Sequence, residues 1–150
     1  DKHHQQLRSI PLSEWLPILK YKANFISLQY GAHQSEIDVF TDKTGIPIYN
    51  WDDADPLTDL DDFSAQIKAL DLVISIDNST VHFSGSLGVS TFTLLPYDQE
   101  WRWMDKKSDS LWYPHIMRLF RQEKEDTPLW KNVIDTVSIE IEKNFPFLAH

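Results

Sequence analysis

The sequence of 150 residues contains no cysteine and only four glycines, and both shortages exclude classes of protein. Without cysteine the chain has neither disulfide bridges nor thiol chemistry, which fits a reducing compartment, and we expect a cytoplasmic protein. Four glycines are too few for a flexible linker, and there is no internal repeat or low-complexity stretch. We therefore predict a single domain over residues 1–150.

Long apolar runs and basic residues are also scarce. No apolar run approaches the roughly 20 residues that a membrane span needs, and the first six residues are polar. The chain has 23 acidic and 14 basic residues, which give a formal charge of −9. We therefore expect it to repel polyanions and anionic lipids. Neither nucleic acid nor a membrane is expected as a partner. The net negative charge does not exclude a small anionic ligand, because charges are screened beyond about 8 Å at physiological salt.

The sequence does contain a regular alternation of strand-like and helix-like segments. Apolar or β-rich runs predict strands at 24–29, 46–49, 72–76, 91–95 and 116–120, and helical patterns predict helices at 33–40, 60–70, 79–87 and 128–144. With 41% hydrophobic residues the chain can fill one core. The alternation predicts an α/β domain, a Rossmann-like parallel sheet flanked by helices.

The helices expected at the two ends differ in their support. Thr127 is a good N-cap for the last helix, Pro128 suits its first position, and its apolar residues share one face (Leu129, Val133, Ile134, Val137 and Ile141). Residues 11–20 predict a helix that Pro17 should bend. A strand normally precedes the first helix of a doubly wound domain, yet residues 1–10 contain none. We therefore expect a fragment whose first strand is missing.

The turn Asp77-Asn78-Ser79-Thr80 is the leading candidate for a binding site. It follows the apolar run 72–76, which we expect to lie inside the sheet, and it opens a short helix that Gly88 should end. Ligands of open α/β sheets bind at the carboxyl ends of such strands. A helix N-terminus carries roughly +0.5 charge and unpaired N–H groups, which favour a phosphate. The alternative, to which we give equal weight, is that Asp77 or Ser79 merely caps the helix.

Two ionisable residues of this region have open roles. A carboxylate repels a diphosphate, so we assign Asp77 to sugar or ribose hydroxyls. His82 falls in the first helical turn, where it either donates to a phosphate or packs against the sheet.

Residues 71–88, followed by Leu94-Leu95-Pro96, resemble the C-terminal half of GT-B glycosyltransferases of the ADP-heptosyltransferase type. The resemblance is closer to relatives fused to tetratricopeptide repeats, which carry segments similar to 101–103, 112–114 and 118–122 of this chain. It covers most of the chain and rests on the order of these segments. One departure is Asn78-Ser79, where heptosyltransferases usually have Thr-Gly or Thr-Ala, so the resemblance does not assign the sugar.

The resemblance implies that this half binds the nucleotide sugar, while an N-terminal half binds the acceptor and supplies the catalytic base. No catalytic residue is then expected in this chain. It also implies that Arg8 contacts the diphosphate and that Gln29 and Gly31 contact the ribose and base.

Two further groups of residues are weighed for binding. Asp53-Ala54-Asp55 fits an Asp-x-Asp metal motif, but a solvated loop that leads to an N-cap at Asp59 is the favoured interpretation, so no metal is expected. Arg102 lies between aromatic residues, which form either a lid or the edge of a core, and its charge suits a phosphate.

Together these features predict the donor-binding domain of an inverting, metal-independent glycosyltransferase that needs no cofactor and is inactive as this fragment. The alternative from another class is a non-catalytic Rossmann-like module that serves interaction beside a repeat domain.

Overall fold

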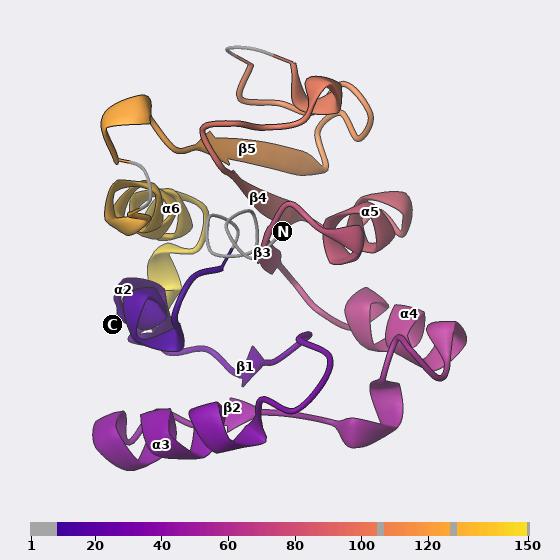
Figure 1. Ribbon diagram of the computed structural model, residues 1–150, viewed down its shortest axis with the longest axis vertical. Coiled ribbons are helices and arrows are strands. Elements are labelled where there is room, and N and C mark those ends of the chain that lie inside the picture. The colour runs from indigo at the N-terminus through magenta and orange to yellow at the C-terminus, as the bar shows by residue number, and fades with distance from the viewer. Residues whose placement is uncertain (1–8, 105–106, 127–128, 150) are drawn as a thin grey trace. The chain divides into compact units, whose positions relative to one another are not determined.

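The computed structural model of the chain describes residues 9–104, 107–126 and 129–149 (Figure 1). The chain divides into two compact units, which are described separately. Unit 1 contains the start of the chain up to Ser9 and Ser64–Val133, and unit 2 contains Ile10–Phe63 and Ile134–His150. Unit 2 is therefore built from two segments that flank Ser64–Val133 in the sequence.

The sheet of unit 1 has three parallel strands, β3 (Val73–Ile76), β4 (Thr91–Leu95) and β5 (Met117–Arg121). They are hydrogen-bonded in the order β3-β4-β5, so all three carboxyl ends meet at one edge (Figure 1). Every residue of β4 is buried, whereas β3 is only partly buried. The prediction that the run 72–76 lies inside the sheet is thus wrong for this sheet, since β4 is its middle strand.

Helix α5 (Ser79–Ser86) packs against β3 and β4, and a short 3-10 helix, η3 (Trp101–Trp103), follows β4. One core cluster of unit 1 is formed by Val81, Leu95, Trp103, Met117 and Leu119, with the ring of Tyr113 packed against it. Gly88 follows α5 with φ of +72°, as expected for the residue that ends a helix. A second 3-10 helix, η4 (Lys124–Asp126), follows β5.

Unit 2 has a two-stranded parallel sheet of β1 (Phe25–Ile26) and β2 (Ile48–Tyr49), joined by α3 (Gln34–Thr44). The strands and helices of the two units confirm the predicted α/β class, in which parallel strands are flanked by helices. Unit 2 also contains the short helices η1 (Leu12–Trp15), α2 (Leu16–Leu19), η2 (Asp52–Ala54) and η5 (Pro146–Ala149). Helices α4 (Leu60–Lys68) and α6 (Lys131–Asn144) each begin in one unit and end in the other.

The two segments of unit 2 are joined by the hydroxyl of Tyr21. This group donates to Oε1 of Glu142 at 2.7 Å, and it also lies 2.7 Å from Oγ and 3.1 Å from the carbonyl oxygen of Ser138. Burial raises the pKa of Tyr21, so the hydroxyl keeps its proton at neutral pH. Tyr21 therefore ties the chain just after α2 to the face of α6.

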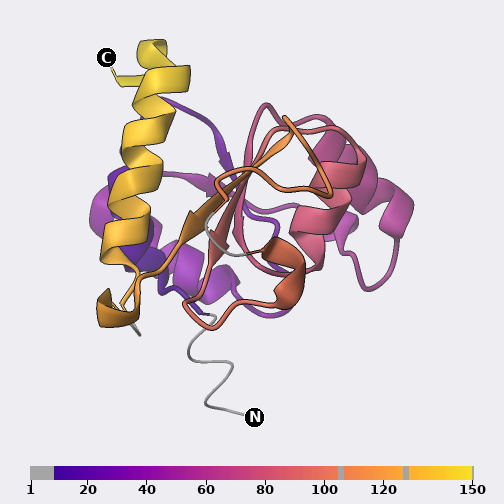
Figure 2. The ribbon, with the colours of Figure 1, turned by 90° about the horizontal axis from the view of Figure 1, so that it is seen from above.

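The end helices differ in part from their predictions. The first is not one bent helix, because a 3-10 turn precedes α2 and Pro17 lies within the first turn of α2. Helix α6, seen from the side in Figure 2, begins at Lys131. The cap predicted at Thr127 and Pro128 lies outside the described residues. Leu129 precedes the helix and is 64% exposed, so its assignment to the apolar face is wrong, whereas the other four apolar residues are buried.

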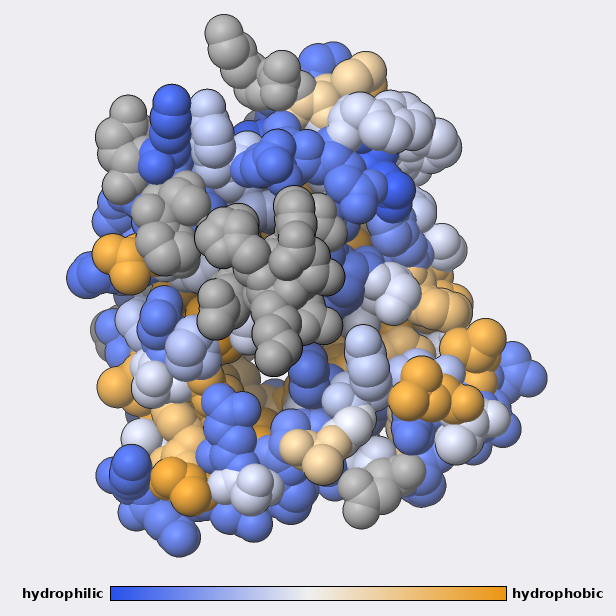
Figure 3. Space-filling view, viewed as in Figure 1, coloured by the Kyte–Doolittle hydropathy of each residue, from blue (hydrophilic) through white to orange (hydrophobic). Residues whose placement is uncertain are grey.

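Figure 3 shows one face of the molecule, on which hydrophilic residues are widespread and apolar residues lie between them, some of them side by side. Within the described residues no helix is both long and apolar enough to cross a membrane.

Candidate functional site

The candidate site lies at the carboxyl edge of the unit 1 sheet, where Asp77 follows β3. The Asp77 N–H donates to the carbonyl oxygen of Leu94 at 3.1 Å, which extends the pairing of the two strands by one residue. Asp77 is only 7% exposed, and its Oδ2 atom is buried without a hydrogen-bond partner. A buried carboxylate oxygen is costly to leave unpaired, so an external donor would be favourable here.

Helix α5 is capped by Asn78, not by Asp77 or Ser79. Asn78 has an extended backbone, and its Oδ1 accepts a hydrogen bond from the Thr80 N–H at 2.9 Å. The side chain of Asn78 thus satisfies one of the N–H groups of the first turn, which have no acceptor within the helix. Ser79 is exposed, while Thr80 is buried, so only Ser79 presents its hydroxyl at the surface.

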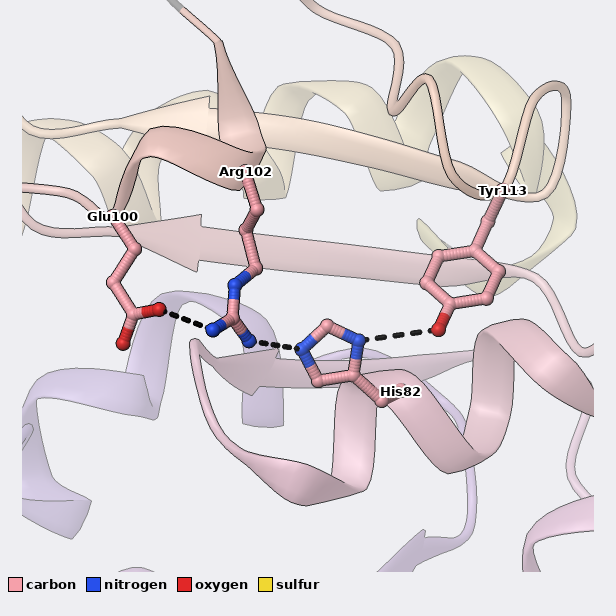
Figure 4. Close-up of polar contacts among 4 residues, drawn as sticks. All are labelled: His82, Glu100, Arg102 and Tyr113. Atoms are coloured by element: carbon pink, nitrogen blue, oxygen red, sulfur yellow. Dashed lines mark hydrogen bonds and ion pairs between the residues drawn. The ribbon is translucent and has the colours of Figure 1, made fainter.

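His82 lies at the centre of a chain of polar contacts that joins three segments (Figure 4). Its Nδ1 is 3.1 Å from the Tyr113 hydroxyl, and its Nε2 is 3.3 Å from Nη1 of Arg102. Nη2 of Arg102 forms an ion pair with Oε2 of Glu100 at 2.5 Å. The guanidinium can only donate, so Nε2 of His82 accepts and Nδ1 carries the proton that is donated to Tyr113. The contacts therefore fix a neutral imidazole in one tautomer.

The surroundings of the imidazole favour the same neutral state. The ring stacks on Trp103, with centroids 5.3 Å apart and planes inclined by 18°. Burial lowers the pKa of His82, the nearby charge of Arg102 lowers it further, and Asp77 and Glu100 oppose this to a smaller extent. His82 is therefore neutral at pH 7. Both ring nitrogens of His82 have partners in this structure, Tyr113 at Nδ1 and Arg102 at Nε2.

The structure brings five of the predicted residues of unit 1 to one edge, namely those of the 77–80 turn and His82, and adds Arg102 through its contact with His82. It also places Glu100 and Tyr113 in the same network, and sequence reasoning had assigned no role to Glu100. No spacing in the sequence could have indicated this, because the contacts depend on how the segments after β4 return over α5.

Gln29 and Gly31 belong to unit 2, on the loop that follows β1, and both are exposed. The loop is held by His33, whose Nδ1 donates to the Gly31 carbonyl oxygen at 2.6 Å, while its Nε2 lies 3.1 Å from Oγ of Ser27 and 3.2 Å from Oδ1 of Asn50. His33 had appeared isolated in the sequence. Arg8 lies outside the described residues.

The acidic residues Asp55 and Asp59 stabilise a turn and the start of a helix, respectively. Oδ1 of Asp55 accepts from the Leu57 N–H at 2.8 Å, and Oδ1 of Asp59 accepts from the N–H groups of Asp61 at 2.9 Å and Asp62 at 3.1 Å. This confirms the predicted N-cap at Asp59. Across the residues described, no group of three or more histidine, aspartate or glutamate side chains could hold a metal ion.

Comparison with known proteins gives one relative. The chain is 35% identical over 85 residues to Protein FlbA of Caulobacter vibrioides (strain ATCC 19089 / CIP 103742 / CB 15). The aligned region is 56% of this chain but only 14% of FlbA, so the chain spans a small part of that protein. No protein-family model and no solved structure matches the chain. The chain is thus similar to a short stretch of FlbA, and its function has to be argued from the site.

Proposed function

We propose that this chain is the donor-binding half of an inverting, metal-independent glycosyltransferase, and that it binds a nucleotide diphosphate sugar at the carboxyl edge of the unit 1 sheet. The observation that carries the proposal is the buried, unpaired Oδ2 of Asp77 beside the first turn of α5 and the Arg102–His82 pair. The ordered resemblance of the sequence to such enzymes supports it. An N-terminal acceptor-binding half would be the partner, and the cytoplasm the place of action.

The diphosphate would meet complementary groups at the start of α5. The first-turn N–H groups, the helix dipole and the exposed Ser79 hydroxyl favour an anion. The Arg102 side chain is 36% exposed, so its guanidinium can reach a ligand and form charge-assisted hydrogen bonds. By the resemblance, Arg8 would add a second positive contact to the diphosphate.

The sugar or ribose would use Asp77. Its unpaired oxygen can accept a hydrogen bond from a hydroxyl, which removes the penalty of leaving it unsatisfied. In the reaction these groups would stabilise the departing nucleotide diphosphate, while the absent half activates the acceptor hydroxyl for attack. The chain alone should bind nucleotide without turnover.

Calorimetry with ADP, UDP and GDP tests the proposal. We expect at least one nucleotide to bind at millimolar concentration or below, and Arg102→Gln to weaken that binding roughly tenfold, which is the loss of about 1.4 kcal/mol. Arg118→Gln, on an exposed position of β5, is the matched control and should leave the affinity unchanged. If none of the three nucleotides binds to the wild-type chain, the proposal fails for this chain.

One observation favours the alternative, a non-catalytic module. Glu100 already pairs with Arg102, and Asn78 already caps α5, so part of the site is satisfied without a ligand. Ser79→Leu in the full-length protein separates the two functions. It should abolish transferase activity if the site binds the donor, and it should leave partner binding intact if the domain only mediates interaction.

A further inference from the structure

The side chain of Arg121 fastens the loop that carries Arg102 and Trp103 to the end of β5. Its Nη2 donates to the carbonyl oxygens of Trp103 and Met104, each at 2.7 Å, and its Nε donates to Oε1 of Gln99 at 3.0 Å. Its Nη1 donates to the carbonyl oxygen of Lys107. One guanidinium thus binds acceptors from residues 99–104 and from Lys107.

The backbone that Arg121 holds is strained. Met104 ends η3 with φ of 52° and ψ of 151°, a conformation that residues other than glycine avoid. Its amide donates to the Trp101 carbonyl oxygen at 3.2 Å, and the turn directs Trp103 into the core, where it is 1% exposed. The two successive carbonyl groups at Trp103 and Met104 face the same guanidinium, which stabilises this turn.

We propose that Arg121 is a positioning residue, whose guanidinium holds residues 99–104 in the conformation that places Trp103 and Arg102 on His82. The four bonds described above join Arg121 to Gln99, Trp103, Met104 and Lys107, so it acts on His82 through this segment. For the ligand this inference rests on the proposed function.

A guanidinium is needed because of the geometry of the acceptors. Arginine presents five N–H donors in a rigid planar fork, and four of its bonds here diverge to four different residues. A lysine ammonium has three donors on a flexible stem and would hold fewer of these acceptors at once. Arg121→Lys therefore keeps the charge and loses the fork.

The imidazole of His82 reports the position of the loop. The charged and titratable groups that face it are Arg102 and Glu100 from the loop, Tyr113 from the turn before β5, and Asp77 from the end of β3. If the loop moves away, His82 becomes more hydrated and loses the charge of Arg102. Both changes raise its pKa toward the ordinary histidine value, even with the partial loss of Glu100.

The test is an NMR titration of the His82 ring in the wild-type chain, Arg121→Lys and Arg118→Lys, with the signal assigned from the spectrum of His82→Gln. We expect the pH at the midpoint of the His82 titration to rise in Arg121→Lys. It should stay unchanged in Arg118→Lys, the control on the same strand. A folded Arg121→Lys chain with the wild-type midpoint would overturn the inference.

A milder variant covers the case in which Arg121→Lys does not fold. Gln99→Ala removes the side-chain acceptor of the four and leaves the three backbone carbonyl groups in place. It should raise the His82 midpoint by less than Arg121→Lys does, and an unchanged midpoint in this variant also contradicts the inference.

A second arm of the experiment measures ADP affinity by calorimetry. In Arg121→Lys we expect roughly tenfold weaker binding, as Arg102 is no longer held at the site. If the wild-type chain does not bind ADP, UDP or GDP, the proposed function fails, while the NMR titration still decides the role of Arg121. If nucleotide binds equally well to wild type and Arg121→Lys, the proposed function stands and the positioning role is refuted.

Discussion

The ring of Tyr113 lies against the backbone of Gly85 in α5, so closely that a Cβ atom on residue 85 would be 2.7 Å from Cγ of Tyr113. Real Cβ atoms essentially never come this close to another heavy atom. Glycine at position 85 therefore lets the ring approach the helix, and the same ring carries the hydroxyl that pairs with His82. One residue without a side chain thus supports the polar network of the site.

Gly85→Ala should displace the Tyr113 ring and break its hydrogen bond to His82. Overpacking costs about 1–3 kcal/mol, while alanine in a helix gains about 1 kcal/mol over glycine, so we expect a net loss of up to about 2 kcal/mol in urea unfolding. In a Tyr113→Ala background the clash is absent, and the same substitution should stabilise the chain. A destabilising effect of equal size in both backgrounds would show that the Tyr113 contact is not its cause.

The stability of the chain should fall in acid through His82. Its folded pKa lies below the unfolded value of 6.5, so the unfolded state binds the proton more readily. The stabilisation from the neutral ring is complete above pH 6.5 and is lost as the pH falls through the folded pKa. Urea unfolding of wild type and His82→Gln between pH 5 and 8, with the remaining histidines common to both, should show the wild type losing more stability in acid. Parallel pH profiles of the two chains would contradict this.

Glu100→Gln should release Arg102 from its internal ion pair. Because Glu100 raises the pKa of His82, its neutralisation should lower that pKa further. Under the proposed function, Arg102 would then pair with the diphosphate without competition, and we expect ADP to bind roughly fivefold more tightly, the equivalent of about 1 kcal/mol. Asp42→Asn changes the net charge by the same amount at an exposed position of α3 and should have no such effect. Unaltered affinity in Glu100→Gln would argue against a ligand contact by Arg102.

Asn78→Ala should weaken the start of α5. Loss of an N-cap costs about 1 kcal/mol, and here it also leaves the Thr80 N–H without its acceptor. Asn78→Asp keeps an oxygen in the capping position and should retain most of the stability. The comparison is made by thermal or urea unfolding, and equal losses in both variants would rule out capping as the role of Asn78.

Much of the fold followed from local patterns. The strand Thr91–Leu95 was predicted to the residue because it is an uninterrupted apolar and β-branched run, and α5 was predicted to within one residue because small polar residues and Gly88 bound it. The position of β3 in the sheet was not predictable in this way. Apolar content indicates burial, whereas strand order depends on pairing between segments distant in sequence.

The site was predictable only as a set of residues near one turn. The predicted helix start at Ser79 indicated Asp77 and His82 as candidate site residues. The N-cap is Asn78, which the sequence did not single out because several neighbouring side chains are able to cap a helix. The partners of His82 come from residues 20 and 31 positions further along the chain. Contacts over such separations are set by the packing of whole segments, and no local spacing encodes them.

The order of the two units along the chain bears on how the protein forms during translation. The bonds from Tyr21 to Ser138 and Glu142 span 117 and 121 residues, and they join the first and last segments of unit 2. Domains fold as units as the ribosome releases them, N-terminal segments first. All strands of unit 1 are therefore released before α6 is. Tyr21 can bind Ser138 and Glu142 only after the C-terminal segment has also left the ribosome. A stop codon before Ser138 would leave the Tyr21 hydroxyl without these partners.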